Sequence, residues 1–295
     1  MQQPDHRVEM PDGRTVAVHE FGDPSGRVVF AMHGTPGCGL MRPEVGENAR
    51  ELGVRLLAHD RPGYGGSTRQ PGRTIASVAA DVAALADHFG AERFGVWGAS
   101  GGGPHALACA AVLPDRVVAA VAIASSAPYG AEGLDYFEGM GELNAMELEI
   151  MERGPEAHIA FLQEQAGEML SGTPDALREG LSTLLTPVDR DALDLHTARW
   201  LMEVFACAVA PGVEGWHDES VADLGDWGFA VDDIRVPVAI WHGGQDRFVP
   251  IGHGRWLAEH APGAQFHYEP ELGHISIIER RVPDAQAWLA SRLRG

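Results

Sequence analysis

Lysine is absent from this sequence of 295 residues, and its 22 basic residues, all arginines, face 42 aspartates and glutamates. The formal net charge is −20 at pH 7. A chain with so few cations offers no basic patch that could neutralise phosphates. We therefore exclude nucleic acids and anionic membrane surfaces from the expected partners.

Cysteine and long apolar runs are also scarce. The three cysteines, Cys38, Cys109 and Cys207, are too few and too scattered for a disulfide framework or a zinc site. No run of about 18 apolar residues predicts a membrane span, and residues 1–15 lack the apolar core of a secretory signal. We expect a reduced, cytoplasmic protein that uses no metal or cofactor and acts on a small molecule as a monomer or homodimer.

The acidic charge is concentrated in one segment. Residues 127–231 contain 21 acidic residues and 4 arginines, whereas the rest of the chain contains 21 acidic residues and 18 arginines. Two interpretations remain open. The segment can form a solvated surface that keeps the protein in solution, or it can line an entrance that favours cationic or amine-bearing substrates.

Short apolar runs alternate with helical patterns on both sides of this segment. We expect strands at residues 7–10, 14–21, 27–33, 54–59, 94–99, 117–125, 236–242 and 264–268. We expect helices at residues 74–90, 105–113 and 253–260, and a last helix from about residue 277. This alternation predicts an α/β protein with a mostly parallel sheet and helices on both faces.

The acidic segment itself shows only helical patterns, for example at residues 143–151, 156–170 and 192–209. The expected domains are therefore a core of residues 1–126 and 232–295 and a helical cap of residues 127–231. A cap inserted at this point would cover the carboxyl edge of the sheet, where open α/β sheets bind ligands.

A serine flanked by glycines follows the apolar run of residues 94–97. The stretch Gly98-Ala99-Ser100-Gly101-Gly102 lies between an expected strand and an expected helix. A tight strand-to-helix turn of this kind raises the hydroxyl of Ser100 above the sheet and needs small neighbours. A serine hydroxyl is a weak nucleophile at neutral pH, so it requires a base and a group that orients the base.

Asp246 and His274 follow the last two expected strands, in the chain order that this turn predicts. Asp232 and Asp233 are weaker candidates for the acid because they precede their strand. We expect Ser100 to attack, His274 to accept its proton and Asp246 to orient the imidazole.

Together these features resemble the α/β-hydrolase family over almost the whole chain. Two loops carry the likeness further, HGTPG at residues 33–37 and DRPGYGGS at residues 60–67. The resemblance implies an eight-stranded, mostly parallel sheet with an inserted helical cap. It also implies that the backbone N–H groups of Thr35 and Gly101 form an oxyanion hole.

The resemblance assigns supporting roles to other loop residues. His33 and Gly34 support the oxyanion loop, and the Thr35–Pro36 bond is expected to be cis. Asp60 and Arg61 are expected to hold a turn by ion pairing.

Ser100 also narrows the reaction, because dehalogenases and epoxide hydrolases of this fold use a carboxylate nucleophile. We expect a serine esterase that cleaves an ester, thioester or lactone through an acyl-enzyme. The HGTPG loop is also similar to proline iminopeptidases, but these have Trp where Gly101 stands. That aminopeptidase function, a carbon–carbon hydrolase and a non-catalytic ligand receptor remain alternatives.

The sequence also leaves undecided which side chains would line an acyl pocket. Trp200, Met202, Phe205 and Trp216 are candidates, with burial in the core of the cap as the competing role.

Overall fold

The computed structural model describes residues 3–294 and contains one eight-stranded sheet with the order β1-β2-β4-β3-β5-β6-β7-β8. Its strands are β1 (His6–Glu9), β2 (Thr15–Gly22), β3 (Arg27–Met32), β4 (Val54–His59), β5 (Phe94–Ala99), β6 (Val117–Ile123), β7 (Val238–Gly243) and β8 (Gln265–Glu269). Strand β2 pairs antiparallel with β1 and β4, and all other pairs are parallel. The expected mostly parallel sheet is confirmed.

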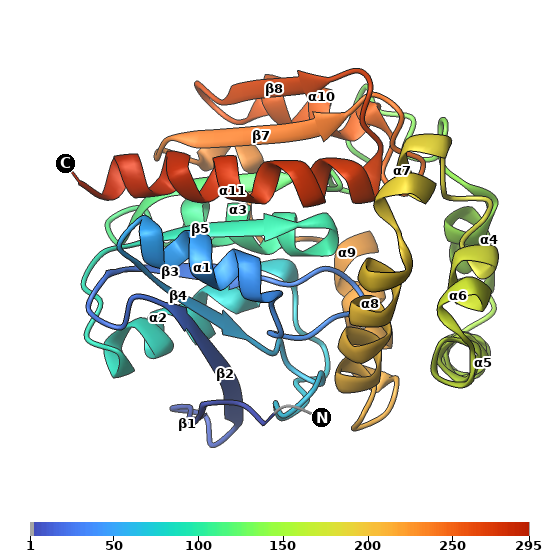
Figure 1. Ribbon diagram of the computed structural model, residues 1–295, viewed down its shortest axis with the longest axis horizontal. Helices are drawn as coiled ribbons and strands as arrows, with labels where there is room; N and C mark the ends of the chain where they lie inside the picture. Colours follow the sequence, from blue (N-terminus) through green and yellow to red (C-terminus); the bar gives the residue numbers. More distant parts are fainter. Residues whose placement is uncertain (1–2, 295) are drawn as a thin grey trace.

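Helices cover both faces of the sheet (Figure 1). Helices α1 (Pro43–Glu51) and α11 (His274–Leu293) pack on one face, and α2 (Val78–His88), α3 (Gly103–Val112) and α10 (Ile251–His260) pack on the other. The strands serve both layers because successive side chains point to opposite faces. In β3, Phe30 joins one core, and Val29 and Ala31 join the other. Central strands buried on both sides explain the continuous apolar runs.

Six helices lie between β6 and β7 and form the helical insertion (residues 127–231). They are α4 (Glu142–Met151), α5 (Pro155–Ser171), α6 (Pro174–Gly180), α7 (Pro187–Ala192), α8 (Leu195–Ala208) and α9 (Glu214–Leu224). They gather at the end of the sheet toward which the arrows of β5 and β7 point (Figure 1). None of the helices within residues 3–294 is long and apolar enough to cross a membrane.

Three local predictions need correction. The expected helix at 74–90 is a short 3-10 turn, η1 (Ile75–Ser77), followed by α2. Helix α1 was not expected from the sequence. Its residues PEVGENARE include only two aliphatic side chains, Val45 and Ala49, which is too few to indicate a buried helix face. Helix α11 begins at His274 instead of near residue 277, so this histidine starts the helix and does not lie in the preceding loop.

Strand β5 and helix α3 meet in a very close backbone contact. A Cβ atom placed on Gly98 would overlap the carbonyl group of Gly102 and lie 2.8 Å from the amide nitrogen of Gly103. A side chain at position 98 would therefore push the start of α3 away from the sheet. The close approach of the two backbone segments explains why position 98 is a glycine.

We expect Gly98→Ala to lower the free energy of unfolding by about 3 kcal/mol, because the added methyl group overlaps backbone atoms. Gly167→Ala is the matched control. Gly167 lies within α5 and a Cβ there would meet nothing within 4 Å, so the same change should stabilise the protein by about 0.5–1 kcal/mol. Urea unfolding followed by circular dichroism measures the free energy of unfolding of both variants. Equal changes in Gly98→Ala and Gly167→Ala would contradict the close contact at Gly98.

Candidate active site

Ser100 occupies a strained turn at the carboxyl end of β5. It is the first residue of the 3-10 turn η2 (Ser100–Gly102), and its φ of 53° lies in the left-handed region. Ala124, just after the neighbouring strand β6, has a φ of 50°. Among residues 3–294 these are the only non-glycine residues with positive φ. Strain of this kind concentrates at functional sites, and both residues lie at the same edge of the sheet.

The 33–37 loop (His33–Gly37) lies directly against this turn. A Cβ atom placed on Gly34 would be 3.5 Å from the Cβ of Ser100, and one placed on Gly101 would be 3.4 Å from the amide nitrogen of Thr35. The Thr35–Pro36 bond is cis. The two expected oxyanion donors, the N–H groups of Thr35 and Gly101, are thus close to each other and to Ser100.

His33 braces the loop through both ring nitrogens. Its Nδ1 donates to the carbonyl oxygen of Gly34 over 2.8 Å, and its Nε2 accepts from the backbone N–H of Arg61 over 3.0 Å. Burial, followed by the charge of Arg61, holds the pKa of His33 well below its usual value. A neutral imidazole with both nitrogens occupied is suited to support and is not available for proton transfer.

Asp246 and His274 form a buried pair. Asp246 follows β7, and its Oδ2 lies 2.8 Å from Nδ1 of His274. The other oxygen, Oδ1, accepts the N–H groups of Phe248 and Val249 over 2.9 and 2.8 Å. The carboxylate is therefore fixed by its own loop, and the imidazole must place Nδ1–H toward it. Nε2 is left facing away from the carboxylate.

The surroundings of His274 favour its protonated form. Burial acts to lower its pKa, but the charge of Asp246, its hydrogen bond and the charge of Asp189 together raise the pKa above the usual value. The ring of Phe248 stacks on the imidazole, with centroids 4.6 Å apart and planes at 20°. Stacking and hydrogen bonding together restrict the ring to one orientation.

Ser100 and His274 line the same cavity, which has a volume of about 450 Å³. Within residues 3–294 the hydroxyl of Ser100 forms no hydrogen bond, so it remains free to turn toward a bound ligand. The insertion contributes about half of the apolar wall, including Leu148, Phe161, Met169, Trp200, Phe205 and Trp216. Met202 instead packs in the core of the insertion with Leu177 and Leu193.

Arg61 connects the 33–37 loop to the insertion. Its guanidinium donates to the carbonyl oxygens of His33 and Gly34 and, over 3.1 Å, to the hydroxyl of Thr35. The same group pairs with Glu219 of α9 over 3.1 Å. The expected ion pair within the turn is therefore wrong, because the partner of Arg61 lies 158 residues away.

Asp60 was expected to form an ion pair, but it mainly accepts hydrogen bonds from backbone N–H groups. One of its carboxylate oxygens accepts the N–H of Gly39 over 2.7 Å, and the other accepts the N–H of Gly66 over 2.8 Å. His19 lies 3.5 Å from the same carboxylate. The turn is thus held by hydrogen bonds from the backbone to Asp60.

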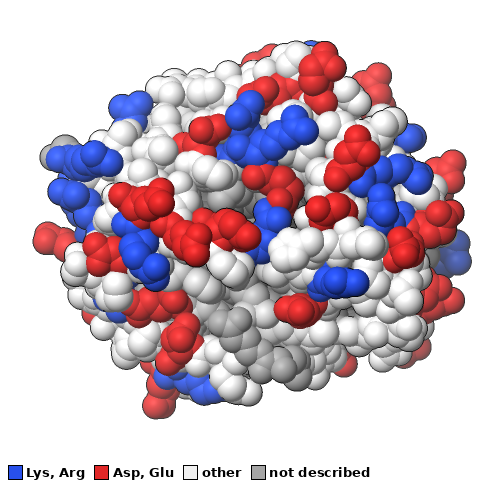
Figure 2. All heavy atoms as spheres, viewed as in Figure 1, with Lys and Arg blue, Asp and Glu red and all other residues white. Residues whose placement is uncertain are grey.

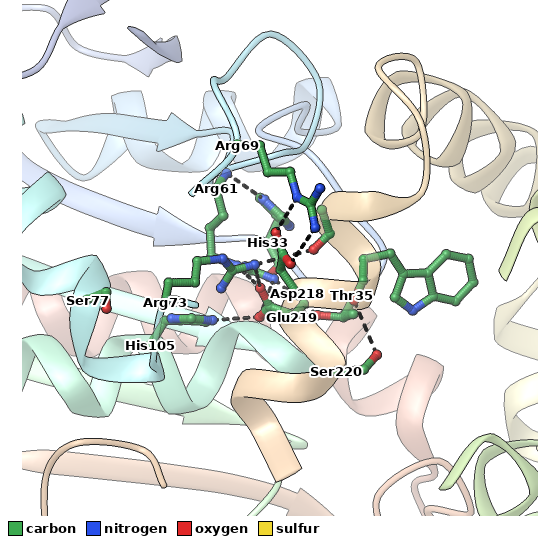
Figure 3. Close-up of polar contacts among 12 residues, drawn as sticks. His33, Thr35, Arg61, Arg69, Arg73, Ser77, His105, Asp218, Glu219 and Ser220 are labelled. Atoms are coloured by element: carbon green, nitrogen blue, oxygen red, sulfur yellow. Dashed lines mark hydrogen bonds and ion pairs between the residues drawn. The ribbon is translucent and has the colours of Figure 1, made fainter. Parts of the chain in front are cut away.

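Glu219 is the centre of a buried charge cluster in which Arg61, Arg73 and His105 all point at one carboxylate (Figure 3). His105 Nε2 lies 2.6 Å from Glu219. Burial opposes the charge of Glu219, yet the two arginines and His105 hold its pKa well below the usual value. Burial, partly offset by Glu219, lowers the pKa of His105 to about 4. At neutral pH one anion therefore faces two cations and a neutral imidazole.

Two further carboxylates of the insertion line the cavity. Asp223 accepts hydrogen bonds from Ser126 over 3.1 Å and from Tyr136 over 3.2 Å. Glu147 accepts from Ser220 over 2.8 Å. Sequence reasoning did not single out these residues, although Glu219 and Asp223 are four residues apart, which places them on one face of a helix.

Most other acidic residues of the insertion face solvent. Fifteen of its 21 acidic side chains are exposed. Acidic and arginine side chains are intermingled on the face shown in Figure 2, with no large field of one sign there. The structure described for residues 3–294 contains no group of three potential ligands that could hold a metal ion.

Comparisons with known proteins identify relatives for nearly the whole chain. The family model described as alpha/beta hydrolase fold matches residues 27–281. A pimeloyl-[acyl-carrier protein] methyl ester esterase of Chromobacterium violaceum is 27% identical over 78% of this chain and 81% of its own length. A probable proline iminopeptidase of Streptomyces coelicolor is also 27% identical, over 83% of this chain and 72% of its own.

Solved structures share the same architecture. An esterase from Exiguobacterium antarcticum superposes with a TM-score of 0.74 at 19% identity and full coverage of both chains. An enol-lactonase from Burkholderia xenovorans has a TM-score of 0.69 at 20% identity, with 98% of this chain and 100% of that chain covered. At 19% and 20% sequence identity, these two structures show that the chain shares their fold.

We expect Glu219→Gln to lower the free energy of unfolding by about 3–5 kcal/mol at pH 7, because two buried arginines lose their anion. The folded-state pKa of Glu219 is depressed, so its contribution is complete above the pKa of the unfolded chain. It is lost as pH falls below about 4.3 toward the folded-state value. The loss in free energy of unfolding caused by Glu219→Gln should therefore become smaller at acidic pH.

Asp218→Asn is the matched control for this prediction. Asp218 also lies on α9, but its partner Arg69 has a side chain that is 40% exposed. Its loss should cost about 1 kcal/mol. Urea unfolding from pH 7 to pH 3.5 compares the two variants, and a Glu219→Gln deficit as small as the control would contradict the role of the cluster.

Proposed function

This chain belongs to the α/β-hydrolase fold family, and from that premise we propose that it is a serine hydrolase that cleaves a carboxylic ester, thioester or lactone of a small molecule. Ser100 is the proposed nucleophile, His274 the general base and Asp246 the acid that orients it. The observation that carries the proposal is the 2.8 Å contact between His274 and Asp246, beside a cavity that Ser100 also lines.

In the proposed acylation step, the Oγ atom of Ser100 attacks the carbonyl carbon while its proton passes to Nε2 of His274. The carbonyl oxygen becomes an oxyanion, which the N–H groups of Thr35 and Gly101 stabilise. Asp246 stabilises the imidazolium that forms. When the tetrahedral intermediate collapses, the bond to the leaving oxygen or sulfur breaks and His274 returns the proton to that atom.

Deacylation repeats these steps with water. His274 Nε2 takes a proton from the water molecule, whose oxygen attacks the acyl carbon, and Ser100 leaves with the proton returned by His274. The products are a carboxylic acid and an alcohol or thiol, or a single hydroxy acid where the substrate is a lactone. No additional group is required to balance the reaction.

The apolar wall supports an acyl group that is largely hydrocarbon. Trp200, Phe205 and Trp216 lie on this wall, and we propose that residues 127–231 act as a cap that sets the length and shape of the acyl chain. The esterase of C. violaceum at 27% identity supports ester chemistry, and a serine at position 100 in place of a carboxylate argues against carbon–halogen or epoxide chemistry.

We expect a fluorophosphonate probe to label Ser100, as located by mass spectrometry of the digested protein. Ser100→Ala should abolish labelling and lower kcat/KM for p-nitrophenyl butyrate by about 10⁴-fold or more. Ser126→Ala is the control, because Ser126 lines the same cavity but bonds to Asp223. Labelling at another serine, or full activity of Ser100→Ala, would refute the proposed mechanism.

A second candidate is recognition of an amine-bearing substrate, as in an aminopeptidase. Glu147 and Asp223 line the cavity, and within residues 3–294 neither forms an ion pair with arginine, unlike Glu219. The probable proline iminopeptidase of S. coelicolor, which is 27% identical, also supports recognition of an amine. The wall at these residues would then bind an ammonium group while Ser100 attacks the neighbouring carbonyl.

Two matched esters separate the candidates. Proline methyl ester and the methyl ester of cyclopentanecarboxylic acid differ only in the ring nitrogen. We expect the carbocyclic ester to be cleaved at least as fast, because the wall is mainly apolar. A preference of about tenfold or more for the proline ester, lost in Asp223→Asn and Glu147→Gln, would instead establish amine recognition.

A further inference from the structure

We propose that Asp189 of the helical insertion is a positioning residue for His274, which it holds by capping the first turn of α11. This inference rests on the proposed role of His274 as the general base. Asp189 lies in α7, far from Ser100 and Asp246 in the sequence.

The contacts of Asp189 are those of a helix cap supplied from another element. Its Oδ2 accepts the backbone N–H of His274 over 2.9 Å. Its Oδ1 accepts both the N–H and the hydroxyl of Ser276, each over 2.9 Å. The side chain is fully buried. The first N–H groups of a helix have no partner within the helix, and a carboxylate is their strongest acceptor.

Gly273 makes room for this arrangement. The residue before a helix usually supplies the cap from its own side chain, but Gly273 has none. A Cβ atom placed on Gly273 would overlap the carboxylate of Asp189. The hydroxyl of Ser276 accepts the N–H of Gly273 over 2.8 Å, but no side chain at position 273 accepts the N–H groups of the first turn. A residue from the insertion takes that role.

His274 is therefore held at two points. Asp189 fixes its backbone N–H, and Asp246 fixes Nδ1 of its ring. With the main chain and the ring both fixed, Nε2 can point in only one direction. We expect this restraint to set the position from which the imidazole accepts the proton of Ser100.

The charge of Asp189 also acts on the imidazole. Burial lowers the pKa of His274, and the charges of Asp246 and Asp189 raise it. His242 on β7 is also titratable and lies 3.7 Å from Asp246, and burial lowers its pKa. His253 on α10 is likewise kept neutral by burial, with a pKa of about 4. The two carboxylates are thus the charged groups that favour protonation of His274.

The test is the pH profile of Asp189→Asn. Without the negative charge the pKa of His274 falls, so the acid limb of kcat/KM for p-nitrophenyl butyrate should move to lower pH by about 0.5 unit. The general base should also be less well oriented, so kcat should fall about tenfold. A cap with a purely structural role would lower stability and leave the limb unmoved, and that result would overturn the proposal.

Two variants serve as controls. Asp191→Asn removes the same charge from an exposed position on the same helix and should leave the profile and kcat unchanged. Ser276→Ala weakens the cap but keeps the charge of Asp189, so it should lower stability without moving the limb. A shift of the limb in either control would show that the Asp189→Asn shift is not specific, and would overturn the proposal.

Two measurements do not depend on turnover. In protein carrying Ser100→Ala, NMR of labelled histidines should show His274 titrating at lower pH when Asp189→Asn is added, and an unchanged titration would overturn the proposal even if the proposed hydrolase function fails. Should Asp189→Asn not fold, amide exchange in the natural protein replaces it. The His274 N–H should be protected like the core of α11, and rapid exchange would refute the cap.

Discussion

The site depends on how closely the backbone at Ser100 approaches its neighbours. The turn from β5 into α3 is packed so tightly that Gly98 touches the backbone of Gly102, and Gly101 faces Thr35. Only residues without a side chain fit there, and the serine between them is forced into the left-handed region. The same closeness that strains Ser100 brings the backbone N–H groups of Thr35 and Gly101 near it. A looser turn would relieve the strain and separate the groups that act together in the proposed mechanism.

The insertion contributes more than a cover for the cavity. Two of its buried carboxylates hold different parts of the site. Glu219 holds Arg61, whose guanidinium in turn holds the 33–37 loop, and Asp189 holds the backbone of His274. The contacts of Glu219 with Arg61 and of Asp189 with His274 each join residues that are more than 80 positions apart. The 33–37 loop and His274 are therefore both tied to the insertion, which also lines the cavity beside them.

Much of this arrangement could be predicted from the sequence, because it depends on local patterns. Apolar runs located the strands, and the polar residues that follow each strand, Ser100 and Asp246 among them, were expected at one edge of the sheet. The partner of Arg61 could not be predicted, since no local pattern indicates an ion pair between residues 158 positions apart. The start of α11 was placed too late for the same reason. Gly273 carries no capping side chain, and the cap that extends the helix back to His274 comes from Asp189.

The overall acidity of the insertion is a poor guide to its ligand. Charges that face water are screened by salt within about 10 Å, and most acidic side chains of the insertion are of this kind. Glu219 lines the cavity but is already neutralised by Arg61 and Arg73. Burial, together with the charges of Glu219 and Glu147, raises the pKa of Asp223 to about 6 against the hydrogen bonds of its neighbours. A cation bound beside Asp223 would lower that pKa again. The acidic residues of the insertion that line the cavity are Glu147, Glu219 and Asp223, and none of them is among the exposed side chains.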